Sequence, residues 1–234
     1  MDATLSDFWW LDNNQLDRFT FLEFGYHEPV DNSQSPSIQS QKCQIADIDK
    51  YRSEYQNINV HRSLKLADNP SNGQEIIGPF LVDIDNDDNL GATQNIAKQT
   101  LEYLIPQYNL SPVSDFRVFF TGHKGFNIEA KPSSLKIGNN ANQYESLYRR
   151  KRRDIIDYLR ERNNVTKDKF NDFDNYVDNN KTLIDVKHEF TRLHNSFNSW
   201  VGDNGKIIYR KKIELSYQDL FEASIEDILN SSEM

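Results

Sequence analysis

Residues 80–85 read FLVDID, and the rest of the expected architecture can be built outward from them. The apolar run at their start follows the turn residues Gly78-Pro79 and predicts a buried strand. Side chains two residues apart on a strand point to the same face, so Asp83 and Asp85 stand side by side while Ile84 faces the core. Carboxylates this close repel each other unless a cation lies between them. Hard oxygen ligands suit Mg²⁺ or Mn²⁺, and these ions are the expected cofactors.

A solvated acidic turn is the alternative interpretation of this pair, because Asp87 and Asp88 follow directly. The buried run before the pair favours a metal site, since metal ligands need a rigid element to hold them. Asp185 also follows a short apolar run and supplies a candidate third carboxylate. We therefore predict that Asp83, Asp85 and Asp185 form a catalytic metal site.

The spacing of apolar residues on both sides of the acid pair predicts a mixed α+β fold in a single domain, residues 1–234. Hairpins and crossovers both occur, which favours α+β over a doubly wound sheet. Helices are expected at 96–105, where Pro106 ends the helix, at 144–161, more weakly at 167–177, and after the capping pattern that begins at Ser216. Strands are expected at 117–120, 126–130, 183–185 and 206–215, a polar loop at 29–44, and packing of the aromatic segment 1–28 onto the main body.

Two segments have the chemistry of phosphate binding. In the turn at 121–125, glycines allow a close backbone approach, while Thr121, His123 and Lys124 supply a hydroxyl, an imidazole and a positive charge. Such a turn suits a triphosphate, although a hairpin whose polar side chains face water is the alternative. If their segment is a strand, Arg192 and His194 share one face and could clamp phosphates. An ordinary surface strand is the competing interpretation.

The charge distribution points to a localised nucleic-acid track. The net charge of −9 counts against a uniformly basic surface. Residues 149–162, however, hold seven basic residues against three acidic ones, and residues 206–212 are basic without an acid. A solvated helix face is the alternative for the first stretch. The expected contacts to nucleic acid are Arg149, Arg150, Arg152, Arg153 and Lys206.

Cysteine usage and hydropathy argue against a disulfide-stabilised, a cysteine-rich zinc-binding or a membrane-spanning protein. Cys43 is the only cysteine, so neither an intrachain disulfide nor a cysteine-rich zinc site is expected. The N-terminus lacks a basic start followed by an apolar run, and no stretch approaches about 18 apolar residues. We therefore expect no zinc, no membrane association and a cytoplasmic location.

The order of these features resembles the archaeo-eukaryotic primase superfamily, which includes primase small subunits and primase-polymerases. A hydrophobic strand ending in D-x-D is followed by a Thr-Gly-x-Lys-Gly-aromatic turn, then by Ile-Asp and by an Arg-Leu-x-x-Ser segment. The resemblance covers roughly residues 60–210, within a motif core of about 60–215. It implies a primase-like catalytic domain with an RRM-like palm sheet and flanking helices.

The resemblance also implies roles for individual residues. Asp83 and Asp85 look like the metal ligands of the family's first motif, and Asp185 looks like the carboxylate of the third. For the family's nucleotide-contacting histidine, His123 is the first choice, and Asn127 stands where relatives with a longer turn have it. Asn198 similarly occupies the place of a common later histidine. The implied nucleotide contacts are Thr121, His123, Lys124, Asn127, Arg192 and Ser196.

The implied activity is template-directed nucleotidyl transfer by a DNA primase or primase-polymerase, which makes primers or extends DNA with two divalent ions. The expected partners are a single-stranded DNA template, nucleoside triphosphates, and a helicase or large-subunit partner. Two alternatives stay open: a metal-dependent nuclease that uses the same acids, and a non-catalytic nucleic-acid-binding replication subunit with a degenerate site. The asparagines at 127 and 198 and the net charge of −9 favour the second alternative.

Overall fold

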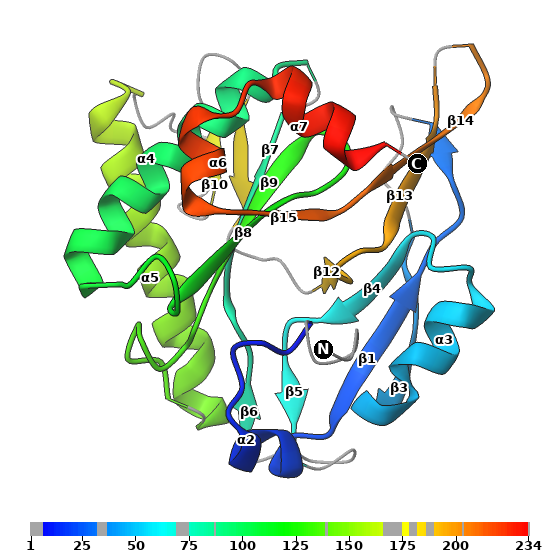
Figure 1. Ribbon diagram of the computed structural model, residues 1–234. Coiled ribbons are helices and arrows are strands. Elements are labelled where there is room, and N and C mark those ends of the chain that lie inside the picture. The colour runs from blue at the N-terminus through cyan, green and yellow to red at the C-terminus, as the bar shows by residue number, and fades with distance from the viewer. Residues whose placement is uncertain are drawn as a thin grey trace.

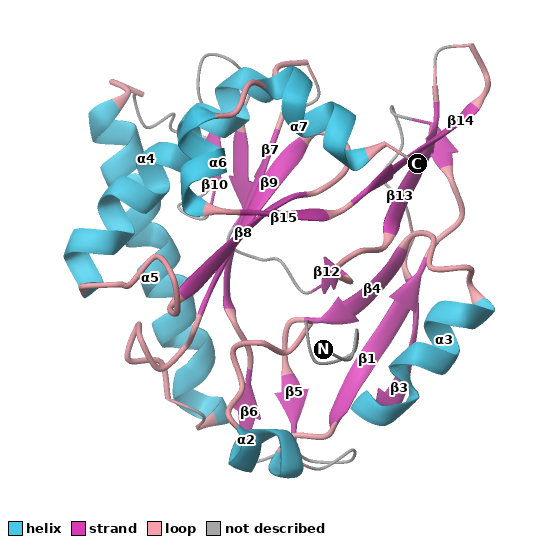
Figure 2. Cartoon of the chain, viewed as in Figure 1, coloured by secondary structure: helices cyan, strands magenta, loops and turns pink. Residues whose placement is uncertain are grey.

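The computed structural model describes residues 7–31, 37–68, 75–86, 88–138, 140–165, 175–177, 182–185, 190–202 and 204–233. Helices and mostly antiparallel sheets are mixed along this part of the chain, which confirms the α+β class (Figure 1, Figure 2). Two sheets of six strands and one of three make up the fold.

The central sheet has the strand order β10-β11-β7-β9-β8-β15, and neighbouring strands are antiparallel. Its main part is a βαββαβ unit, in which helices α4 and α5 connect strands that are not adjacent in the sheet. Both helices lie on the same side of the sheet (Figure 1). The elements are β7 (Phe80–Asp85), α4 (Leu90–Tyr108), β8 (Phe116–Phe120), β9 (Gly125–Ala130), α5 (Ala141–Arg162), β10 (Asn175–Val177), β11 (Leu183–Asp185) and β15 (Ile213–Leu215).

Alternation along β7 gives the central sheet two different faces. Phe80, Val82 and Ile84 belong to the core beneath α4 and α5, together with the alternate residues of β8 and β9. Asp83 and Asp85 therefore lie on the opposite face, which the helices do not cover. The FLVDID pattern thus buries one face of the strand and leaves carboxylates on the other.

An N-terminal sheet with the order β12-β4-β1-β5-β6, to which β3 adds beside β1, builds a second core. The aromatic residues near the N-terminus, such as Phe8, Trp10 and Phe24, belong to this core. Strand β12 is contributed from much later in the sequence and pairs with β4. The elements are α2 (Asn13–Arg18), β1 (Phe21–Tyr26), β3 (Gln39–Gln44), η1 (Ile45–Asp47), α3 (Ile48–Glu54), β4 (Val60–Ser63), β5 (Leu66–Ala67), β6 (Ile76–Ile77) and β12 (Phe190–Arg192).

The third sheet, of order β14-β13-β2, leads directly back to the central sheet. A single residue, Lys212, links β14 to β15, which pairs with β8. Helices α6 and α7 follow and pack on the same core as α4. The elements are β2 (Val30–Asp31), β13 (Phe197–Val201), β14 (Ile207–Lys211), α6 (Tyr217–Glu222) and α7 (Ile225–Ser232).

Several expected element boundaries were wrong. Helix α4 continues through Pro106, and Asn109, in the left-handed conformation, ends the helix instead. Residues 39–44 of the expected loop form β3. Residues 175–177 of the weakly expected helix form β10, whereas 167–174 lie outside the described residues. The terminal helix is two helices, because Ser224 caps a new one after the chain extends at Ala223.

Candidate nucleotide and metal site

The three predicted acids occupy two adjacent strands. Asp83 and Asp85 are partly exposed on the face of the central sheet that faces away from α4 and α5. In the pairing of β11 with β7, Leu183 lies opposite Asp85 and Ile184 opposite Ile84. The same register continued by one residue places Asp185 beside Asp83. The Asp185 side chain lies outside the described part of the structure. Among the described side chains, no three His, Cys, Asp or Glu residues form a group that could hold a metal ion.

Gly125 allows β9 to pass unusually close to Asp85. The two residues are paired across the strands, and a Cβ atom at position 125 would lie 2.1 Å from the Ile84 carbonyl oxygen and 2.2 Å from Asp85 Oδ1. No side chain fits there without displacing the carboxylate or the strand. Glycine at this position therefore fixes the place of Asp85 rather than serving only to form the turn.

Asn86 connects the segments around the acids. It was not identified as a site residue from the sequence. Its backbone N–H donates to the Lys124 carbonyl at 3.0 Å, and its side-chain amide donates to the Thr182 hydroxyl at 3.2 Å. Its Oδ1 accepts from the N–H groups of Asp88 and Asn89, each at 2.9 Å. One buried residue thereby connects the end of β7, the turn before β9 and the start of β11, through its backbone and its side chain. An Asx turn after D-x-D is the only sequence signal for this role.

Asn127 contacts an acid directly. It lies opposite Asp83 in the β7–β9 pairing, and its Nδ2 donates to Asp83 Oδ1 at 2.5 Å. The amide is almost fully buried, so it restrains the carboxylate. At the place where the primase resemblance expects a nucleotide-contacting histidine, the chain therefore has a residue that orients a predicted metal ligand.

The turn at 121–125 is closed by its own hydrogen bonds and lies against the β13–β14 hairpin. The Thr121 hydroxyl donates to the Gly125 carbonyl at 3.1 Å, so it closes the turn itself. Gly122 has φ of +82°, and a Cβ there would lie 2.8 Å from the Arg210 carbonyl oxygen, which explains the glycine. His123 stacks on Trp200, with ring centroids 3.9 Å apart. His123 and Lys124 are both partly exposed.

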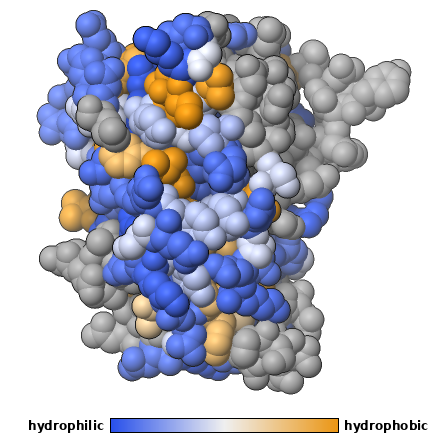
Figure 3. All heavy atoms as spheres, turned by 90° about the vertical axis from the view of Figure 1, so that its right-hand side faces the viewer, coloured by the Kyte–Doolittle hydropathy of each residue, from blue (hydrophilic) through white to orange (hydrophobic). Residues whose placement is uncertain are grey.

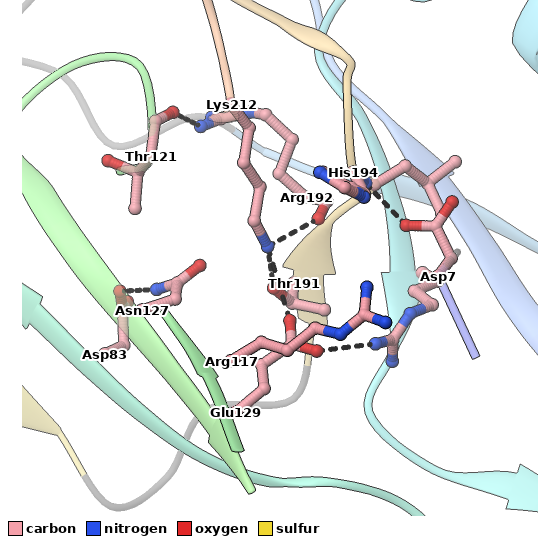
Figure 4. A network of polar contacts seen from close by, with 12 residues as sticks. Asp7, Asp83, Arg117, Thr121, Asn127, Glu129, Thr191, Arg192, His194 and Lys212 are labelled. Atoms are coloured by element: carbon pink, nitrogen blue, oxygen red, sulfur yellow. Dashed lines mark hydrogen bonds and ion pairs between the residues drawn. The ribbon is translucent and has the colours of Figure 1, made fainter. Parts of the chain in front are cut away.

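Arg192 brings positive charge to the acid pair. It ends β12, and one Nη atom donates to the Thr121 carbonyl at 2.9 Å (Figure 4). Burial lowers the pKa of Arg192 to about 10, against the opposing effect of Asp85 and Asp83 beside it. The guanidinium therefore stays charged at neutral pH. The structure brings Arg192, the 121–125 turn and the acid pair together on one face of the central sheet.

Three other polar residues of the 191–198 segment, His194, Ser196 and Asn198, pack against the surrounding structure. Strand β12 ends at Arg192, so His194 does not continue its face but lies in the following turn, with its ring against Phe119. Ser196 is fully buried, and its hydroxyl donates to the Leu193 carbonyl at 2.6 Å. The Ser196 hydroxyl therefore closes the turn, and its expected nucleotide contact stays a prediction. Asn198 is also buried, on β13.

His194 predicts a pH dependence of stability. Burial, with Lys212 nearby, lowers the pKa of His194 to about 4 from its ordinary value of 6.5. The unfolded chain therefore binds a proton at this residue more readily than the folded chain, so stability falls as the pH drops from 6.5 to 4. We expect His194 to contribute a loss on the order of 2 kcal/mol in the free energy of unfolding between pH 7.5 and 4.5.

Urea unfolding of the wild type and of His194→Gln at the two pH values measures this contribution. Glutamine does not titrate, so the variant should lose less stability on acidification than the wild type does. Equal losses in the two proteins would contradict the assignment.

The basic helix lies on the opposite face of the central sheet from the acids. Ile155, Ile156 and Leu159 of α5 pack in the core beneath the central sheet, on the face opposite Asp83 and Asp85. Arg152 is buried and donates to the Leu81 carbonyl at 2.7 Å, so it cannot reach a phosphate. The helical spacing of apolar residues in α5 did not predict which of its basic residues face inward. The remaining predicted contacts, Arg149, Arg150 and Arg153, are at least partly exposed.

The β13–β14 hairpin is a basic and aromatic surface that does adjoin the site. Lys206 is exposed at its tip, and Arg210 lies with its Cζ 6.0 Å from the Trp200 ring centre. Because Trp200 also carries the stacked His123, the hairpin is continuous with the 121–125 turn. Figure 3 views the side of the molecule on which the hairpin lies, and that face is mostly hydrophilic with small apolar patches. A single tryptophan in an alternating strand did not allow this arrangement to be predicted from the sequence.

Comparisons of the sequence with protein families and with curated proteins find no match. The described part of the chain has no helix with the length and apolarity needed to cross a bilayer.

Proposed function

We propose that this protein is a template-directed nucleotidyltransferase, a primase or primase-polymerase that depends on Mg²⁺ or Mn²⁺. One observation carries the proposal: Asp83 and Asp85 lie on the face of the βαββαβ sheet opposite α4 and α5, together with Arg192 and the 121–125 turn. Carboxylates for cations and a cation for phosphates are the two requirements of a nucleoside triphosphate site. The sheet order also supports the palm expected from the primase resemblance.

The described residues fit a divalent ion. Asp83 and Asp85 offer oxygen donors on a strand that is buried on its other face, and the backbone of Asp185 adjoins them. Hard oxygen ligands of this kind suit Mg²⁺ and Mn²⁺. Asn127 holds the Asp83 carboxylate by a hydrogen bond, and the missing Cβ at Gly125 leaves the space that the Asp85 carboxylate occupies. Bound divalent ions would lower the pKa of the attacking 3′-hydroxyl and neutralise charge on the leaving pyrophosphate.

The side chains around the acids would bind the phosphates of the nucleotide. Arg192 carries its charge beside the acid pair and would contact the phosphates, anchored by its bond to the Thr121 carbonyl. Lys124 and His123, both partly exposed in the turn, would contact the same triphosphate. Because the turn is closed by its own hydrogen bonds, these groups need little reorganisation when the nucleotide binds.

A second function is favoured by one contact. The Asn127 amide occupies Asp83 Oδ1, an oxygen that a metal ligand would otherwise offer. This contact would suit a non-catalytic nucleic-acid-binding subunit whose site has degenerated. Such a subunit would bind DNA but would incorporate no nucleotide.

Incubation with a single-stranded template, labelled nucleotides and either Mg²⁺ or Mn²⁺, with products resolved by length, tests the proposal. We expect labelled products longer than a single nucleotide. Reactions that contain a primer and reactions that lack one are run and compared separately. DNA binding without incorporation would support the degenerate subunit, and shortening of the template would support a nuclease.

The template path is expected to follow the β13–β14 hairpin. We expect Lys206→Glu, Arg210→Glu and Lys211→Glu together to weaken binding of a single-stranded oligonucleotide. Each lost phosphate contact removes about 0.7 from the slope of log affinity against log salt, so three contacts remove about 2. Fluorescence anisotropy at several salt concentrations measures both quantities.

Arg149→Glu, Arg150→Glu and Arg153→Glu on α5 form the matched control, with the same change in charge on the opposite face of the sheet. This control should change the affinity much less than the hairpin variant does. A larger loss in the α5 variant would place the track on the helix instead.

A further inference from the structure

Lys212 is a buried lysine at the joint between two sheets. It is the single residue between β14 and β15, and only 1% of its surface is exposed. An ammonium group loses its hydration when it is buried, so it needs several partners inside the protein. Burial lowers the pKa of Lys212, while Glu129 opposes that shift.

The partners of Lys212 lie on two different sheets. Its Nζ lies 3.3 Å from Glu129 Oε1 on β9 of the central sheet. The same nitrogen donates to the Thr191 hydroxyl at 3.2 Å and to the Arg192 carbonyl at 3.0 Å, both on β12 of the N-terminal sheet. Figure 4 shows the lysine reaching between these groups. One side chain therefore ties β12 to the strand that carries Asn127.

Charge compensation accounts for only part of what this lysine does. Lys212 is ion-paired with Glu129 at 3.3 Å, but Glu129 is also paired with Arg62 at 3.4 Å, and the neighbouring Asp7 is paired with Arg52 at 3.0 Å. These side chains are all buried, and without Lys212 the other four contain two acids and two bases. Besides its ion pair, Lys212 adds a pair of hydrogen bonds to β12.

Strand β12 is short and lies at the edge of its sheet. It is three residues long and, within the described part of the chain, pairs with β4 alone. The residues after it are also held, because the His194 backbone bonds to Asp7 and Arg52. The last residue of β12 is Arg192, whose guanidinium donates to the Thr121 carbonyl at 2.9 Å and interacts electrostatically with Asp83 and Asp85. A shift of this short strand would move the guanidinium away from the acid pair.

We propose that Lys212 is a positioning residue, which holds the β12 backbone so that the Arg192 guanidinium stays in place for a nucleotide triphosphate. The inference rests on the proposed function, because it assigns Arg192 to the phosphates. Lys212 itself is buried behind β12 and does not touch the nucleotide.

A double-mutant cycle separates positioning from general stabilisation. Binding of dATP with Mg²⁺ is measured by calorimetry for the wild type, Lys212→Met, Arg192→Met and the double variant. We expect Lys212→Met alone to weaken binding about tenfold, and less than twofold when Arg192 is already methionine. Methionine keeps the apolar stem and leaves the two acid–base pairs intact, so the variant should fold.

Two further variants complete the experiment. Thr191→Val removes one acceptor of the lysine without changing charge, and it should weaken binding about twofold to threefold, only while Arg192 is present. If Lys212→Met does not fold, this variant decides the question. Lys65→Met removes an exposed lysine that is paired with Glu145 and should not change the affinity.

Each pattern of results has one meaning. Equal losses from Lys212→Met with and without Arg192 would overturn the positioning role, as would an unchanged affinity in a folded Lys212→Met when Arg192→Met does weaken binding. If Arg192→Met itself leaves dATP binding intact, the assignment of Arg192 to the phosphates fails and the inference about Lys212 fails with it.

Discussion

Asp83→Asn is expected to reduce nucleotide incorporation about a thousandfold or more, which corresponds to about 4 kcal/mol of transition-state stabilisation. Asparagine keeps the shape of the side chain and the contact with Asn127, but it removes the charge that a divalent ion requires. Asp85→Asn should have a similar effect. Single-turnover extension of a primed template under saturating nucleotide measures the rate, and a thermal melt checks that each variant is folded.

Asp154→Asn is the matched control for these substitutions. This aspartate is exposed on α5, on the opposite side of the central sheet from the acid pair. Its neutralisation should leave the rate within about twofold of the wild type, since surface charges away from the site have small effects. Full activity in a folded Asp83→Asn variant would remove the metal site from the proposal.

Gly125→Ala is expected to destabilise the protein by about 2–3 kcal/mol and to reduce incorporation at the same time. The added methyl group would lie 2.1 Å from the Ile84 carbonyl oxygen and 2.2 Å from Asp85 Oδ1, so either β7 or the carboxylate must move. Moving the backbone here costs free energy, because β7 is the central strand beneath the site. Denaturant unfolding measures the stability, and the extension assay measures the activity.

Gly138→Ala provides the comparison, because a Cβ at that position meets nothing within 4 Å. It should be neutral or slightly stabilising, since alanine restricts the unfolded chain more than glycine does. If Gly125→Ala were as well tolerated as Gly138→Ala, the close approach of β9 to Asp85 would be refuted.

The central strands could be predicted from sequence because their signals are local. FLVDID combines an apolar run with alternation, and it forms β7 at the expected residues. The strands expected at 117–120 and 126–130 form β8 and β9, each longer by one residue at its start. The same alternation placed Asp83 and Asp85 on one face, because a strand fixes the direction of its side chains whatever surrounds it.

What the sequence did not reveal depends on contacts between distant segments. The basic stretch at 149–162 was predicted as a nucleic-acid track, but a helical pattern does not say which face of a sheet the helix covers. His194 was grouped with Arg192 by alternation, although the strand ends between them. Lys212 was read as part of one basic strand from 206 to 215, whereas the change of sheet at this residue buries it.

The late contribution of β12 to the N-terminal sheet has a consequence for the order of folding. This strand comes from residues 190–192, yet it pairs with β4 at residues 61–63. During synthesis, the N-terminal sheet therefore cannot be completed until most of the chain has left the ribosome. Closure of such a long loop is slow compared with the local pairing of β8 and β9. The β8–β9 hairpin, with α4 beside it, is thus the natural place for the chain to begin folding, and Arg192 reaches the acids as one of the last steps.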